Sequence, residues 1–265
     1  MSDAPHPGIE HTLTGDVRTH EAFHSRYLEQ DRTIIVYLPP GYDPQSADRY
    51  PVLYLHDGQN VFDRATSIGE EWHVDESAQR LILAGEIQPL IVVGIYNTGV
   101  HRIDEYTPTP STDGGGHAAD YGRMLVEELK PFIDATYKTL PSAASTAIGG
   151  SSLGGLLTMH LGLRYPTAFS RLAVMSPSVW WDDREILREV EALPGKLPMR
   201  IWLDAGTAEG ERVLDDARAL RDALLAKGWI NGEDLAYLEA QGGEHNEQSW
   251  AARVDAVLKF LFPPG

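Results

Sequence analysis

The sequence predicts an α/β domain built on a mostly parallel central sheet, with antiparallel N-terminal strands and helices on both faces. From the middle of the chain onward, short apolar runs alternate with longer stretches of helical periodicity, as in a parallel sheet covered by helices. Near the N-terminus, polar β-rich segments are joined by connections too short for a crossover helix. Strands joined in that way are expected to be antiparallel.

Nine segments are expected to be strands. Several are nearly continuous apolar runs, as strands buried on both faces of a sheet should be. The expected strands cover residues 10–16, 21–28, 33–38, 52–56, 90–96, 144–148, 172–176, 200–204 and 235–239.

The helices are expected between these strands. Apolar residues recur at spacings of three and four in each of them. The expected helices cover residues 118–137, 156–165, 213–227 and 250–262, and TPTPSTDGGG at 107–116 is expected to be a mobile surface loop. No linker divides the chain, so we expect one domain over residues 1–265, with residues 1–9 as a flexible tail.

Composition narrows the range of partners. The 265 residues include 22 Lys and Arg against 39 Asp and Glu, a net charge of −17, which argues against nucleic acid or an anionic membrane as a partner. With no Cys, the chain has no disulfides, thiolate metal sites or Cys nucleophile. No apolar run approaches the roughly 20 residues that span a bilayer. No signal peptide is visible, so we expect a cytoplasmic protein, or a secreted one if a leader was removed. The oligomeric state is open.

A candidate nucleophile lies in the segment GSSLG at 150–154, which matches G-x-S-x-G. It follows the expected strand 144–148 and precedes the expected helix 156–165, the strand–turn–helix setting of a nucleophile elbow. Gly150 and Gly154 would make room for the strained turn. A phosphate-binding turn is the alternative, disfavoured because the common phosphate-loop motifs are absent. The sequence therefore predicts Ser152 as the nucleophile.

A candidate base follows from the chain order Ser, acid, His that this setting requires. Only two of the ten His residues, His160 and His245, come after Ser152. His160 lies in the helix after the elbow, whereas His245 lies in a Gly-rich loop after the last expected strand. We therefore expect His245 to be the base.

The candidate acids follow the expected strand 200–204. Glu209 is the first choice because it lies in the loop beyond the C-terminal end of that strand, where active sites of open α/β sheets form. Asp204, at the strand end, is second and Glu211 is third.

Two backbone N–H groups are expected to form an oxyanion hole. Leu153, which follows the nucleophile, supplies one of them. The other is expected from HDGQN at 56–60, with Gln59 as first choice and Gly58 as second. His56 and Asp57 could instead pair on a metal, but polar residues at a strand end more commonly stabilise the loop by hydrogen bonds.

Aromatic and polar residues in two loops are candidates for substrate binding. Trp180 and Trp181 follow the expected strand 172–176 and so lie at the C-terminal edge of the sheet. Either one fills the core while the other is partly exposed, or one ring forms a wall on which a sugar or aromatic group stacks. Arg102, Glu105 and Tyr106 would face that wall and hydrogen-bond to substrate hydroxyls.

A competing motif is HEAFH at 20–24, a match to the zinc-protease pattern H-E-x-x-H. That site needs a helix so that both His side chains share one face. The surrounding residues are typical of a strand, in which positions four apart are separated by about 13 Å, too far to share one zinc ion. A zinc metallopeptidase using His20, Glu21 and His24 is therefore a disfavoured alternative.

Several of these segments together resemble the putative esterase family of α/β hydrolases, whose relatives include feruloyl and acetyl-xylan esterases, siderophore esterases and mycolyl transferases. The resemblance runs from about residue 32 onward. It implies the α/β-hydrolase fold, no metal or organic cofactor, Ser152 and His245 as nucleophile and base, and an N-terminal strand at 20–24. The identity of the acid is the assignment that the resemblance supports least. The segments that carry it are YLPPGYD (37–43), LYLHDGQNVFD (53–63), VVGIYN (92–97), EYTP (105–108), GGSSLGG (149–155), MSPSVWW (175–181), DAGTAE (204–209) and GGEHNEQSW (242–250).

These observations predict a serine carboxylic-ester hydrolase that acts through an acyl-enzyme on acylated carbohydrates or related small esters. The expected partner is thus a small-molecule or oligosaccharide ester. An acyltransferase using the same site stays open. A non-catalytic binding module is disfavoured because the Ser, His and acid positions are all filled.

Overall fold

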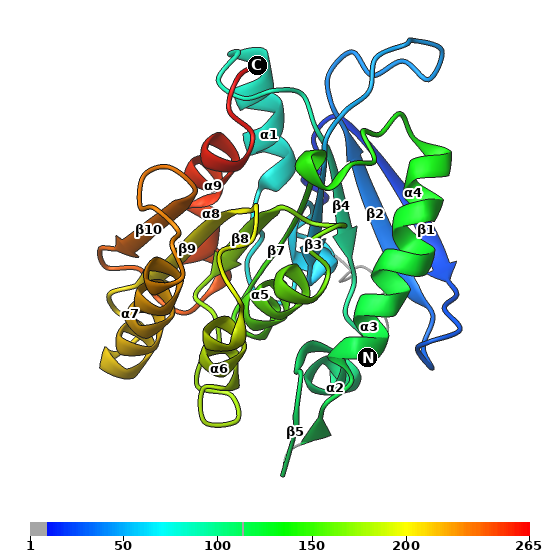
Figure 1. Cartoon of the computed structure of the whole chain (residues 1–265). Coiled ribbons are helices and arrows are strands. Elements are labelled where there is room, and N and C mark those ends of the chain that lie inside the picture. The colour runs from blue at the N-terminus through cyan, green and yellow to red at the C-terminus, as the bar shows by residue number, and fades with distance from the viewer. Residues whose placement is uncertain (1–9, 113) are drawn as a thin grey trace.

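The computed structural model describes residues 10–112 and 114–265, over which the main feature is an eight-stranded sheet (Figure 1). Its strand order is β1-β2-β4-β3-β7-β8-β9-β10. Only β2 runs antiparallel to its neighbours β1 and β4, so the predicted mostly parallel sheet with antiparallel N-terminal strands is confirmed. The strands are β1 (Asp16–Phe23), β2 (Arg32–Leu38), β3 (Val52–His56), β4 (Ile91–Ile95), β7 (Thr146–Ser151), β8 (Arg171–Met175), β9 (Arg200–Gly206) and β10 (Leu235–Ala240).

Helices cover both faces of the sheet because successive strand residues point to opposite sides. Tyr54 packs into the apolar cluster under α3 to α7, whereas its neighbours Leu53 and Leu55 pack into the cluster under α1, α8 and α9. In Figure 1, α5, α6 and α7 lie on the near face. The helices are α1 (Val74–Leu83), α2 (Arg102–Tyr106), α3 (Ala118–Arg123), α4 (Lys130–Thr136), α5 (Leu153–Arg164), α6 (Glu185–Ala192), α7 (Glu211–Ala226), α8 (Glu247–Ala251) and α9 (Val254–Leu261), with short 3-10 turns η1 (Gly58–Asn60), η2 (Gly99–His101) and η4 (Ala143–Ser145).

The N-terminal region departs from the prediction. The two strands expected at 10–16 and 21–28 are wrong, and the single strand β1 (Asp16–Phe23) takes their place. The backbone N–H of Thr12 donates to Asp63 at 3.2 Å and that of Thr14 donates to Asp75 at 2.6 Å. These two backbone N–H groups are thus bonded to side-chain carboxylates and not to the carbonyl groups of a neighbouring strand. The tail expected at residues 1–9 lies outside the described residues.

The helix expected at 118–137 forms, but in three parts. A π-helical segment, η3 (Met124–Leu129), separates α3 from α4, and Pro131 follows it in the first turn of α4. The segment 107–116 contains a short hairpin, β5 (Pro110–Ser111) with β6 (Gly114–Gly115), where a loop was expected. Helices α1 and α6 were not predicted, and both begin after a residue in the left-handed conformation without a side-chain cap. Among the described residues, no helix combines the length and apolarity needed to cross a bilayer.

Candidate active site

Ser152 lies in the tight connection between β7 and α5 with φ 57° and ψ −121°. Such a conformation is strained for a residue that has a Cβ atom. The connection is held in part by Ser152 N, which donates to Met175 O at 3.1 Å on the neighbouring strand β8. The strained turn presents the Ser152 side chain at the C-terminal edge of the sheet.

The crowding around this turn explains some of its glycines. A Cβ atom on Gly150 would lie 3.0 Å from His56 Cδ2 and 3.1 Å from the carbonyl carbon of Gly154. One on Gly155 would lie 2.8 Å from Met175 O, whereas one on Gly154 would make ordinary contacts from 3.4 Å. The close approach predicted at Gly150 is therefore present, and the second tight position is Gly155 instead of Gly154.

The structure brings Ser152, His245 and Glu209 into one hydrogen-bonded row. His245 Nε2 lies 2.9 Å from Ser152 Oγ, and His245 Nδ1 lies 2.7 Å from Glu209 Oε2. The His245 side chain is 39% exposed while that of Glu209 is fully buried. Trp250 packs edge-on against the imidazole at 5.1 Å. The loops after β7, β9 and β10 thus supply a hydroxyl, a carboxylate and an imidazole in the order that proton transfer from serine requires.

The two other acid candidates lie elsewhere. Asp204 accepts a hydrogen bond from Trp202 Nε1 at 2.6 Å and pairs with Arg253 at 3.1 Å beneath the row. Burial raises the pKa of Asp204 to about 6, even though Arg253 acts to lower it. Glu211 is exposed at the start of α7. Of the three candidates, Glu209 is the one that contacts His245.

Glu209 is held by groups that the sequence did not indicate. Its Oε1 accepts hydrogen bonds from Ser176 Oγ and from the Gly206 backbone N–H, both at 2.6 Å. Burial favours a higher pKa for Glu209, but the hydrogen bonds from His245, Ser176 and Gly206 outweigh it and lower the pKa. The Glu209 carboxylate therefore stays ionised and can stabilise a positively charged imidazole. Ser176 is itself oriented by Trp250 Nε1, which donates to its Oγ at 3.0 Å.

Ser152 opens onto a cleft of about 240 Å³. Its lining is Asp57, Gln59, Asn60, Ile68, Trp72, Asn97, Arg102, Ser151, Ser152, His245, Glu247 and Trp250. Ser178, another residue that the sequence analysis did not single out, places its Oγ 3.4 Å from Ser152 Oγ. The backbone N–H groups of Gln59 and Leu153 have no hydrogen-bond partner among the described residues. Gln59 itself lines the cleft, and Leu153 directly follows Ser152.

Arg102 is the predicted substrate-binding residue that the structure brings to the cleft. Its Nε and Nη2 donate to the two Asp57 carboxylate oxygens, both at 2.7 Å, and Asn97 Nδ2 donates to Asp57 Oδ1 at 2.7 Å. Burial favours a raised pKa for Asp57, but Arg102 and Asn97 lower it. Glu247 lines the same cleft, and burial raises its pKa. The ionised Asp57–Arg102 pair is therefore a fixed polar wall of the cleft.

Glu105 and Tyr106 were expected to face the cleft, but both side chains lie in the core. Glu105 forms a buried two-bond ion pair with Arg32, at 3.0 and 2.9 Å, which ties α2 to β2. Tyr106 is fully buried, and its hydroxyl accepts a hydrogen bond from the Asp57 backbone N–H at 3.1 Å. Both side chains point from α2 into the core, so both stabilise the helix that begins at Arg102.

The adjacent Trp residues divide between core and surface. Trp181 is 4% exposed in the main apolar cluster, and its Nε1 donates to Thr109 O at 3.1 Å. Trp180 is 43% exposed, and neither ring lines the cleft with Ser152. Of the two arrangements expected from the sequence, the structure thus shows the one in which one Trp fills the core and the other is partly exposed, and it places neither ring as a stacking wall beside Ser152.

The other candidate metal ligands of the sequence are engaged elsewhere. HEAFH lies in β1 and just beyond it; His20 Nε2 lies 2.7 Å from the Tyr137 hydroxyl and His24 Nδ1 lies 2.8 Å from Asp31. His56 is fully buried, and burial lowers its pKa to about 3. Among the described residues, one group of three could hold a metal ion: Glu71, His73 and Glu76, none of which lines the cleft.

The chain is similar to known proteins in its sequence and in its fold. The family model described as "Putative esterase" matches residues 25–261. The ferri-bacillibactin esterase BesA of Bacillus subtilis is 28% identical over 263 residues, covering 89% of this chain and 86% of that protein. An endo-1,4-beta-xylanase/feruloyl esterase of Xylanibacter ruminicola is 28% identical over 91% of this chain and 30% of its own length. The crystal structure of the BES protein from Bacillus cereus superposes with a TM-score of 0.75 at 23% identity, covering 94% of this chain and 96% of that one.

Proposed function

We propose that this chain, which belongs to the putative esterase family, acts as a serine hydrolase through an acyl-enzyme on Ser152. It has the α/β-hydrolase fold and is a carboxylic-ester hydrolase. The observation that carries the serine mechanism is the pair of contacts from Ser152 Oγ to His245 at 2.9 Å and from His245 to Glu209 at 2.7 Å.

The reaction begins with proton transfer. His245 Nε2 takes the proton of Ser152 as its Oγ attacks the ester carbonyl carbon, and the imidazolium then donates that proton to the departing alcohol. A water molecule, deprotonated by the same nitrogen, attacks the acyl-enzyme and releases the acid. Glu209 holds the Nδ1–H side of the ring and stabilises the imidazolium through its ionised carboxylate.

The tetrahedral intermediate needs donors for its negatively charged oxygen. The Leu153 N–H lies in the first turn of α5, where backbone donors have no partner within the helix. The Gln59 N–H lies in the η1 turn that lines the cleft. We assign the oxyanion hole to these two groups, which would be worth about 3 kcal/mol each in the transition state.

The cleft supports a short-chain ester of a polyhydroxylated alcohol as the substrate. Its volume of about 240 Å³ lies below the roughly 300 Å³ at which drug-sized pockets begin, which favours a small acyl group. Asp57, Asn60, Asn97, Arg102 and Glu247 supply many hydrogen-bonding groups for hydroxyls. We therefore favour acylated carbohydrates or related small esters over the siderophore esters that the names of some relatives indicate.

A panel of esters tests both parts of the proposal. We expect acetylated xylan fragments and p-nitrophenyl acetate to have higher kcat/KM than p-nitrophenyl octanoate or a ferric catecholate siderophore. Ser152→Ala abolishes hydrolysis of every ester in the panel, whereas the matched Ser151→Ala retains most of it. An inactive Ser151→Ala beside an active Ser152→Ala contradicts the mechanism. A preference for octanoate or the siderophore contradicts the substrate class and leaves the mechanism standing.

A further inference from the structure

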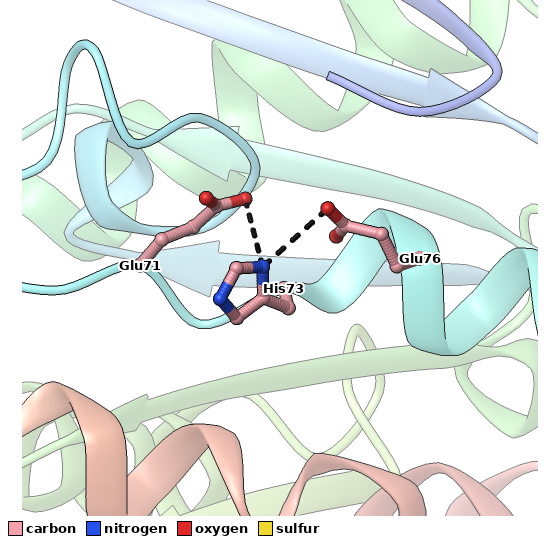
Figure 2. A group of neighbouring side chains, drawn as sticks. All are labelled: Glu71, His73 and Glu76. Carbon is pink, nitrogen blue, oxygen red and sulfur yellow. Dashed lines mark hydrogen bonds and ion pairs between the residues drawn. The ribbon is translucent and has the colours of Figure 1, made fainter. Parts of the chain in front are cut away.

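A second group of chemically active side chains lies outside the Ser152 cleft, where the chain enters α1. Figure 2 shows the carboxylates of Glu71 and Glu76 both directed at the same ring nitrogen of His73. His73 Nδ1 lies 3.4 Å from Glu71 Oε1 and 3.4 Å from Glu76 Oε1, and the three atoms lie within 4.8 Å of one another. We propose that Glu71, His73 and Glu76 bind a divalent metal ion of the zinc type.

The spacing of the three atoms fits one ion between them. Zinc bonds to imidazole nitrogen and carboxylate oxygen are about 2.0–2.2 Å long, so neighbouring ligand atoms of a tetrahedral site lie about 3.3–3.6 Å apart. The two separations of 3.4 Å from His73 Nδ1 fall in that range. They are too long for good hydrogen bonds, which have donor–acceptor distances of about 2.7–3.2 Å. Both separations from His73 Nδ1 are thus those expected between ligands of one ion, whose fourth position would be open to water.

Burial of Glu71 is a second, independent observation that favours a bound cation. Its side chain is fully buried, and its Oε1, the atom facing His73, accepts no hydrogen bond from any described residue. Its other oxygen is fixed by Thr12 Oγ1, which donates to Oε2 at 2.6 Å. A buried carboxylate oxygen without a partner is costly, and a bound cation would remove that cost. Thr12 meanwhile orients Glu71 as outer hydrogen-bond partners orient metal ligands.

The donor set selects the class of ion. One imidazole nitrogen with two carboxylate oxygens suits zinc and its first-row neighbours, whereas magnesium and calcium favour sites made of oxygen alone. Thr12, in the N-terminal segment, hydrogen-bonds to Glu71, and Glu76 lies in the first turn of α1. Trp72, between Glu71 and His73, lines the Ser152 cleft and packs against Trp250 at 5.9 Å. A bound ion would therefore fasten the segment that carries one wall of the cleft.

Zinc binding by the full chain tests the inference directly. We would strip the protein with a chelator and measure the stoichiometry and affinity of Zn²⁺ by equilibrium dialysis, together with the melting temperature. One Zn²⁺ per chain and a higher melting temperature are expected for the wild type, because an ion that binds only the folded state stabilises it.

Two variants locate the ion. His73→Asn removes the imidazole, and Asn tolerates the left-handed backbone of that position, where φ is 53°. Glu76→Gln removes a carboxylate at the start of α1. Each is expected to weaken Zn²⁺ binding by about 100-fold or more, since changing even an outer partner costs about 10- to 100-fold. The matched control His24→Asn, an exposed imidazole beside Asp31, should bind as the wild type does.

Three outcomes overturn the proposal. The first is a wild type that binds no Zn²⁺ at millimolar concentration. The second is His73→Asn with wild-type affinity and stoichiometry. The third is binding that is lost in His245→Ala and kept in His73→Asn, which would place the ion at the Ser152 cleft.

Discussion

The conformation of Ser152 predicts that the chain is more stable with glycine at this position than with alanine. Ser152 has φ 57° and ψ −121°, a combination that a Cβ atom disfavours and that glycine adopts readily. Ser152→Ala and Ser152→Gly both remove the hydroxyl and its contacts with His245 and Ser178. They differ only in the Cβ atom, so their comparison isolates the strain of the turn.

The size of the effect follows from two opposing contributions. A non-glycine residue in a sparsely populated backbone region costs about 1–3 kcal/mol. Glycine loses about 0.5–1 kcal/mol more than alanine to chain entropy on folding. With the midpoints of these two ranges, the free energy of unfolding of Ser152→Gly should exceed that of Ser152→Ala by about 1.25 kcal/mol, or about 2.5–5 °C in melting temperature for a chain of this size.

Ser151 provides the matched control. It is the preceding residue, it is buried in β7 opposite Met175, and its φ is not positive. Glycine at that position relieves no strain, so Ser151→Gly should be less stable than Ser151→Ala by about 0.5–1 kcal/mol. The two pairs of variants thus change stability in opposite directions.

Urea unfolding at pH 7 measures the four free energies, and hydrolysis of p-nitrophenyl acetate monitors function. Both Ser152 variants are expected to be inactive. If Ser152→Gly is no more stable than Ser152→Ala, or if the Ser151 pair shows the same sign as the Ser152 pair, the strain assigned to the elbow is not there.

Three further predictions concern the contacts of His245 and Glu209, the buried Asp204, and the two adjacent Trp residues. His245→Ala should lower kcat/KM for p-nitrophenyl acetate as far as Ser152→Ala does, and Glu209→Gln should lower it by about one to two orders of magnitude less; near-normal Glu209→Gln with inactive Asp204→Asn would move the acid to Asp204. Because burial raises the pKa of folded Asp204 to about 6, against about 3.9 in the unfolded chain, its contribution to stability is full below pH 4 and is lost as the pH rises through 6. The difference in free energy of unfolding between the wild type and Asp204→Asn, measured with urea, should therefore fall by about 3 kcal/mol between pH 4 and pH 7. A difference that does not change with pH would show that Asp204 does not titrate in this range. Trp181→Ala should lower the free energy of unfolding by about 3–5 kcal/mol while Trp180→Ala changes it by less than about 1, and equal losses in thermal melts would contradict their different burial.

Features that depend on the local order of residues along the chain could be predicted from the sequence. Continuous apolar runs predicted the parallel strands, because a strand buried on both faces has no polar side. G-x-S-x-G between strand and helix predicted the position of Ser152, since the turn needs small neighbours within a few residues. The chain order after Ser152 left His245 as the base, and Glu209 was preferred because the ends of parallel strands meet at one edge of the sheet.

Which side chains lie next to one another depends instead on the tertiary packing. Glu105 and Arg102 are three residues apart, yet one pairs with Arg32 in the core and the other with Asp57 at the cleft. Both are charged loop residues in the sequence, and only the packing of α2 against the sheet separates them. Likewise, nothing in the local sequence distinguishes Ser176 from other serines, and its place directly after β8 brings it beside Glu209. Hydrogen bonds and burial act through space between segments far apart in sequence, so no local pattern of residue types records them.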